Sequence, residues 1–177
     1  MLLLLVVSSL NANGWTQRKS SVKHTSSAAQ SLRTQSAGSI SVTLTRAPDG
    51  APMTAASSGQ QVMDLGAVSY GAGSRVSNVE VNKRTDRFVV ATRFGLVIQD
   101  STGRSSSAAV LAYLAYPENV YTFWIDGVKL AATPQMVQAQ ARLGVTQSHR
   151  LQIEVPATLS EKNSQLQNAV IFQVVPN

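Results

Sequence analysis

The sequence contains no cysteine and few charged side chains. Without cysteine the chain has no disulfide framework, no thiolate metal site and no cysteine nucleophile. Charged residues make up 14% of the 177 residues and hydrophobic residues 44%, which is typical of a surface of hydroxyls and amides rather than ion pairs. A chain of this length can bury a core that needs no metal or disulfide. We therefore expect one domain held together by apolar burial.

Acidic residues are absent before Asp49, so most of the net charge belongs to the N-terminus. The first 46 residues carry five basic side chains and no acidic one, whereas residues 47–177 carry ten basic and nine acidic side chains. A formal charge of +6 would suggest a nucleic-acid or membrane partner if it were spread over the folded body. Because that body is nearly neutral, we predict no nucleic-acid partner.

The apolar run at residues 1–10 is too short to span a bilayer as a helix, which needs roughly 20 residues. It has the length of a signal-peptide core, and Ala12 and Gly14 are small residues two apart, as a cleavage site requires. We expect a signal peptide over residues 1–14, no stable membrane span, and export to the periplasm, cell surface or extracellular space. No Lys or Arg precedes the run, and a buried first strand or helix is the alternative.

Residues 15–39 are predicted to be a flexible basic tail. From Thr16 onward they are rich in Ser, Thr, Gln and Ala, and Val22 and Leu32 are their only large aliphatic residues. Such a segment buries too little apolar surface to order itself. The folded domain is then expected over residues 40–177.

Regular alternation begins at Ile40, where Ile40, Val42 and Leu44 point one way and the intervening residues the other. Further β-type runs follow, separated by turn residues at the spacing of sandwiches and barrels. They cover residues 62–68, 76–81, 87–99, 108–116, 120–125, 128–130, 149–155 and 169–175.

Two local features refine this strand pattern. Gly95 inside the run 87–99 predicts a bulge or bend. Asp126 and Gly127 predict a two-residue hairpin turn, because both central positions of a type I′ turn need positive φ. Residues 134–142 alone have helical composition and predict one short helix. The fold class is all-β, a single antiparallel β-sandwich of immunoglobulin-like or pilin-like type, with a small barrel as the rival.

Four features of the chain resemble secreted bacterial fimbrial and spore-coat-U-like β-sandwich subunits. They are the N-terminal strand 39–46, the segment MDLGAVSYG (63–71), the segment VATRFGL (90–96) and the hydrophobic C-terminal strand. The chain also resembles uncharacterised exported bacterial proteins with a similar WIDGV turn (124–128) and an HRL strand start (149–151). The resemblance implies strand donation, in which one subunit's N-terminal strand completes a neighbour's sheet. Ile40, Val42 and Leu44 would then insert into the neighbour, unless that strand pairs within its own sheet.

Residues that could carry catalysis are scarce. A Ser-His-acid set could use only His24, in the tail, or His149, which opens a predicted strand where a surface or edge histidine is the usual finding. The acids show no spacing that fits a calcium loop or paired-carboxylate hydrolase, and no Gly-x-Ser-x-Gly elbow is present. We predict no enzymatic activity, no cofactor and no metal site.

Aromatic residues cluster between positions 113 and 124, and aromatic platforms often hold sugars. Tyr113, Tyr116, Tyr121 and Trp124 are the candidate ligand contacts, with Trp124 beside the hairpin turn expected to be the exposed one. Core packing is the alternative for this cluster. The sequence predicts a structural or adhesive subunit that self-assembles as a homo-oligomer or fibre, and the alternative function is a monomeric carbohydrate-binding module.

Overall fold

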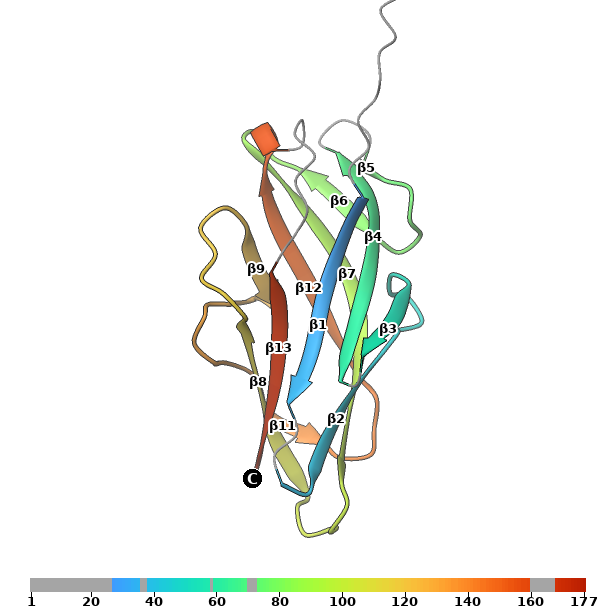
Figure 1. Ribbon diagram of the computed structural model, residues 1–177, viewed down its shortest axis with the longest axis vertical. Helices are drawn as coiled ribbons and strands as arrows, with labels where there is room; N and C mark the ends of the chain where they lie inside the picture. Colours follow the sequence, from blue (N-terminus) through green and yellow to red (C-terminus); the bar gives the residue numbers. More distant parts are fainter. Residues whose placement is uncertain (1–26, 36–37, 58, 70–72, 160–167) are drawn as a thin grey trace, which may run out of the picture.

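The computed structural model describes residues 27–35, 38–57, 59–69, 73–159 and 168–177. These residues form two β-sheets that pack face to face (Figure 1). The all-β sandwich prediction is confirmed, and two separate sheets replace the barrel alternative. Helical structure in the described ranges is confined to the 3-10 turn η1 (Ala157–Leu159). No helix in that part of the chain is long and apolar enough to cross a membrane.

Sheet 1 has seven strands and is antiparallel except where its first and last strands in sequence meet. Its order is β11 (Gln135–Arg142), β8 (Ser107–Leu114), β13 (Ala169–Pro176), β1 (Ser27–Gln35), β4 (Gln60–Ser69) and β3 (Met53–Ser57), and β5 (Gly73–Ser74) also pairs with β4. The first described strand, β1, therefore lies in the interior of the sheet, between β13 and β4 (Figure 1).

Sheet 2 has six antiparallel strands. Its order is β10 (Val128–Lys129), β9 (Thr122–Ile125), β12 (Gln147–Pro156), β7 (Arg87–Asp100) and β2 (Ile40–Thr45), and β6 (Glu80–Lys83) pairs with the other half of β7. The chain changes sheets between β1 and β2 and again between β2 and β3, so the N-terminal strands join the two layers.

The core lies between the sheets and follows from the alternation of apolar residues along the strands. In β2 every second residue is buried, as the sequence pattern predicts. Phe94 of sheet 2 and Phe172 of sheet 1 meet at a ring-centroid distance of 5.2 Å. Both are almost fully buried, and burying such a side chain contributes about 1.5–3 kcal/mol.

The hairpin predicted at Asp126 and Gly127 is confirmed. These residues have φ of 49° and 83° and connect β9 to β10. Positive φ at both positions is what a type I′ turn requires.

The prediction of a flexible tail is wrong for residues 27–35, which form β1. Backbone pairing to a strand on each side and complete burial of Leu32 order this segment despite its polar composition. The predicted signal peptide (1–14) and residues 15–26 and 36–37 of the predicted tail lie outside the described residues.

The short helix predicted at residues 134–142 is also wrong, because β11 occupies this stretch and pairs with β8 at the edge of sheet 1. Pairing with an apolar neighbouring strand overrides the weak helical preference of the local composition.

Gly95 does not form the predicted bulge, because β7 keeps its register with both neighbours through this position. A Cβ atom at Gly95 would lie 2.3 Å from Thr45 Oγ1, so close approach of β2 explains the glycine. A register shift occurs instead between Ala28 and Ala29 of β1, opposite Gly66 of β4, which has φ of 69°.

Candidate functional site

Strand β1 fills a slot between β13 and β4. It pairs in parallel with β13 over Ser31–Gln35 and antiparallel with β4 over Ser27–Arg33. At its C-terminal end, the Thr34 N–H donates to Gly59 O at 2.8 Å. The backbone of β1 is thus engaged on both sides, as in any interior strand.

The side chains of β1 anchor it much less than its backbone does. Leu32 is the only large apolar residue of the strand, and it is fully buried. Gln30, two residues earlier on the same face, is also fully buried. Arg33 and Gln35, on the opposite face, are exposed. The strand therefore depends on one leucine and on backbone hydrogen bonds.

Asn168, the residue before β13, holds the end of this slot where β1 begins. Its side chain donates to Tyr116 O at 2.9 Å and accepts from Tyr116 N at 3.2 Å. It also accepts from Ala169 N at 2.9 Å. The backbone carbonyl of Asn168 accepts a hydrogen bond from Gln30 Nε2 at 3.2 Å. The buried amide of β1 is therefore tied to a residue that the β8–β9 loop holds in place.

The residues predicted to insert into a neighbour lie in the chain's own core. Ile40, Val42 and Leu44 are at most 6% exposed and belong to β2, which pairs with β7 of the same chain. This arrangement corresponds to the alternative in which the strand pairs within its own sheet.

The candidate aromatic contacts do not share one surface. Tyr113 lies on sheet 1, where its hydroxyl donates to Gln35 Oε1 at 3.1 Å, whereas Trp124 lies on sheet 2. Tyr121 packs against the core. Tyr116 is 66% exposed, while Trp124 is only partly exposed and its indole nitrogen is buried. The expectation that Trp124 is the exposed contact is wrong, because it is Tyr116 that is largely exposed.

His149 faces the core instead of lying at the surface or at an edge. It is 4% exposed, its ring stacks on Phe94 at 5.6 Å, and its Nδ1 lies 2.6 Å from Asp126 Oδ2. Its Nε2 is buried and has no hydrogen-bond partner. A Ser-His-acid mechanism needs a hydroxyl at that nitrogen, and no hydroxyl of the described residues occupies the position.

Asp126 combines a turn position with an interior partner. Partial burial raises the pKa of Asp126, but hydrogen bonds from His149 and the Arg150 N–H, together with the positive charge of Arg93, lower it more. The net pKa lies below the ordinary value of 3.8. Asp126 therefore stays ionised and holds the turn against β12.

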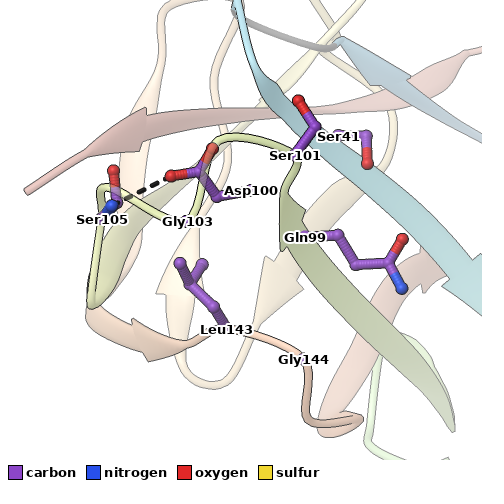
Figure 2. A pocket seen from close by; sticks show the side chains of 8 residues that line it. All are labelled: Ser41, Gln99, Asp100, Ser101, Gly103, Ser105, Leu143 and Gly144. Atoms are coloured by element: carbon purple, nitrogen blue, oxygen red, sulfur yellow. Dashed lines mark hydrogen bonds between the residues drawn. The ribbon is translucent and has the colours of Figure 1, made fainter.

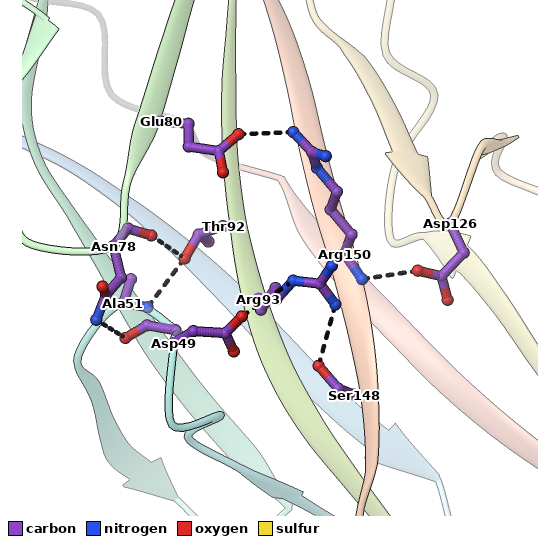
Figure 3. Close-up of polar contacts among 10 residues, drawn as sticks. Asp49, Ala51, Asn78, Glu80, Thr92, Arg93, Asp126, Ser148 and Arg150 are labelled. Atoms are coloured by element: carbon purple, nitrogen blue, oxygen red, sulfur yellow. Dashed lines mark hydrogen bonds and ion pairs between the residues drawn. The ribbon is translucent and has the colours of Figure 1, made fainter.

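A polar groove of about 330 Å³ lies beside β7, between the β2–β3 loop, the start of β6 and Arg150 of β12. Figure 3 shows the polar contacts around it. Arg93 Nε lies 3.2 Å from Asp49 Oδ2, and an Arg150 nitrogen lies 2.7 Å from Glu80 Oε2. These partners are substantially exposed, and such surface pairs contribute about 0–1 kcal/mol each. Each arginine of the groove faces a carboxylate, so the groove presents no uncompensated charge.

One wall of this groove is the loop that leads from β2 to β3. The buried Thr92 hydroxyl donates to Asn78 O at 2.8 Å and accepts from Ala51 N at 2.9 Å (Figure 3). A Cβ atom at Gly50 would lie 2.2 Å from Arg93 O, so this loop lies directly on the backbone of β7. These contacts fix the crossing between the two sheets.

A larger hollow of about 510 Å³ lies between the β7–β8 loop and the turn that follows β11 (Figure 2). Its carboxylate, Asp100, accepts hydrogen bonds from the Thr102 hydroxyl and from the N–H groups of Thr102, Arg104 and Ser105. These bonds, that of the Thr102 hydroxyl first, hold the pKa of Asp100 far below its usual range. Asp100 closes its own loop and has both oxygens occupied.

The described residues contain no group of three or more His, Asp or Glu side chains placed to hold a metal. Among their features, the β1 slot combines an interior strand, a single apolar anchor and a buried amide. Sequence reasoning missed it because a strand with one large apolar residue shows little alternation. Leu32, an isolated aliphatic residue in a polar segment, was the available signal.

Comparison with known proteins gives no family: no protein-family model matches the sequence, and no curated protein is similar to it.

Proposed function

We propose that the protein is an exported structural or adhesive subunit that self-assembles through β-strand pairing into a pilus or surface fibre, with β1 as the strand that passes between copies. The observation that carries this proposal is the interior position of β1. An N-terminal strand with one large apolar side chain lies between β13 and β4, each of which pairs with a further strand on its other side, β8 and β3.

Removal of β1 would leave β13 and β4 with unpaired backbone groups facing an open slot. Such a slot is a template for another strand, and the sequence with the matching pattern is β1 of a second copy. Exchange restores the same hydrogen bonds and the same burial of Leu32. Strand exchange of this kind is a low-cost route to association because the two states share their contacts.

The connection between β1 and β2 favours exchange as well. Four residues, 36–39, separate Gln35 from Ile40, and Gly38 has φ of 60°. A connection of only four residues between strands of different sheets is of the short kind that favours exchange of a strand between copies. Export itself is supported by the apolar run at residues 1–10.

The absence of cysteine allows a direct test. Ser31 of β1 and Val62 of β4 are directly opposite in an antiparallel pair, a spacing within reach of a disulfide. One chain of residues 15–177 carries Ser31→Cys and a second carries Val62→Cys. The two are unfolded together, refolded at high concentration and oxidised. A mixed disulfide, identified by peptide mapping, is expected because β1 of the first chain enters the slot of the second.

A matched pair of variants tests exchange of β2 instead. Thr43 of β2 and Val97 of β7 are also directly opposite, so Thr43→Cys mixed with Val97→Cys reports whether this strand crosses between chains. We expect little mixed disulfide from this pair. If neither pair forms a mixed disulfide, and Ser31→Cys combined with Val62→Cys in one chain closes only within that chain, strand exchange is wrong.

A further inference from the structure

Gln30 is a fully buried amide in a strand that otherwise has one large apolar anchor. Its Nε2 donates to Asn168 O at 3.2 Å and to Ser31 O at 2.8 Å. Its Oε1 is buried and has no partner. Two carbonyl acceptors on one side of the amide fix which atom is nitrogen, because the reverse orientation would place three oxygens together. The amide is therefore held in one orientation and is only partly satisfied.

A buried, partly satisfied amide costs stability relative to an apolar side chain. In coiled coils a single buried amide of this kind is kept because it selects one register and one partner. The acceptor here is suited to such a role. Asn168 is held by Tyr116 and Ala169 at the end of the slot, so its carbonyl is a fixed mark along β13.

We propose that Gln30 sets the register in which β1 enters its slot, by pairing with Asn168 O in one position and by being excluded from the neighbouring apolar site. It is a positioning residue. If copies exchange β1, as in the proposed function on which this point rests, the same contact sets the register in which β1 of a second copy binds in the slot.

The competing register is a shift of β1 by two residues, because a shift of one would turn its inner face outward. In a shift toward β2, Gln30 would take the site of Leu32, and Leu32 would take that of Thr34. The site of Leu32 is fully buried within the apolar core. The amide would lose Asn168 O there, whereas a leucine or methionine at position 30 would fit. Removing the amide should therefore narrow the free-energy difference between the two registers.

Disulfide reporters distinguish the two registers. Ser31→Cys with Val62→Cys reports the native register, in which these positions are opposite. Ala29→Cys with Val62→Cys reports the shifted register, because Ala29 would then lie opposite Val62 instead of opposite Asp64. Each pair is placed in the full chain with Gln30, with Gln30→Leu or with Gln30→Met, and oxidised in a glutathione buffer. The ratio of shifted to native disulfide is the measured quantity.

We expect the ratio of shifted to native disulfide to rise roughly tenfold in Gln30→Leu and Gln30→Met, which corresponds to about 1.4 kcal/mol. Arg33→Met is the control, since it changes a long side chain on the exposed face of the same strand, and it should leave the ratio unchanged. The methionine variant, which matches glutamine in length, gives the answer if the leucine variant does not fold. An unchanged ratio in the folded variant would overturn the role of Gln30.

Separating the oxidised products by mass on non-reducing gels distinguishes this inference from the proposed function. A disulfide within one chain gives a monomer and a disulfide between chains gives a dimer, and the ratio of the two registers is measured in either product. If all disulfides lie within one chain and the ratio still rises, strand exchange fails and the role of Gln30 stands. If disulfides form between chains and the ratio stays constant, only the role of Gln30 fails.

Discussion

Replacing Leu32 with alanine should remove most of the side-chain anchoring of β1. Leu32 is fully buried, and its strand has a neighbour on each side. Leucine-to-alanine changes at such sites cost about 2–5 kcal/mol, depending on how far the surroundings close the cavity. β4 and β13 are held by further strands and cannot move in to fill the space. We therefore expect a loss of about 3–4 kcal/mol, a large part of a stability of about 5–15 kcal/mol.

The loss can be measured by equilibrium unfolding in urea, followed through tryptophan fluorescence. Leu111→Ala serves as the control, because Leu111 is partly exposed on the outer face of β8, where truncation costs no more than about 1 kcal/mol. If Leu32→Ala is no more destabilising than Leu111→Ala, then β1 does not occupy the slot, and both its interior placement and the strand-exchange mechanism are refuted.

Gly50→Ala should lower the thermal unfolding midpoint more than Gly103→Ala. A Cβ at Gly50 would lie 2.2 Å from Arg93 O, whereas one at Gly103 would meet nothing within 4 Å. Alanine at Gly103 has only the strain of its φ of 65°, about 1–2 kcal/mol. Equal midpoints would show that the loop does not lie on β7. Asp126→Asn should flatten the acid side of the stability profile. The pKa of Asp126 is lower in the folded chain than its ordinary value of 3.8, so its stabilising contribution is full above that value and is lost as the pH falls through the folded pKa. Urea midpoints between pH 7 and pH 3 measure this, and an unchanged acid slope in the variant would contradict the role of its contact with His149.

Local rules predicted the parts of the fold whose signals lie within a few residues. Alternation over residues 40–45 predicted β2, and the Asp-Gly pair predicted the β9–β10 hairpin, because strand period and positive φ are properties of the local chain. β1 and β11 were missed because pairing with residues distant in sequence orders them. β1 has one large apolar residue, Leu32, and so shows little alternation. β11 is an edge strand with exposed residues such as Met136, so its pattern is weak as well.

The candidate site was harder to predict than the fold, since it depends on what lies around each side chain. Nothing in the sequence near Gln30 indicates that its amide is buried against Asn168, 138 positions away. His149 was expected at the surface because it begins a strand. The inward face of β12 at that point meets Phe94, and this pairing is set by the register between two strands.

The short connection between β1 and β2 limits the symmetry of any exchanged assembly. The chain from Gln35 to Ile40 reaches at most about 18 Å. This is shorter than the long strands of the sandwich, since the ten residues of β12 span about 33 Å. When β1 of one chain fills the slot of a neighbour, β2 of the first chain must begin within this reach of the point where β1 leaves the slot. The end of the neighbour's slot and the start of β2 in the first chain must therefore lie close together. A two-fold pair, in which each partner lends its strand to the other, meets this limit at both ends. A fibre built from such pairs would need a second and different contact to join one pair to the next.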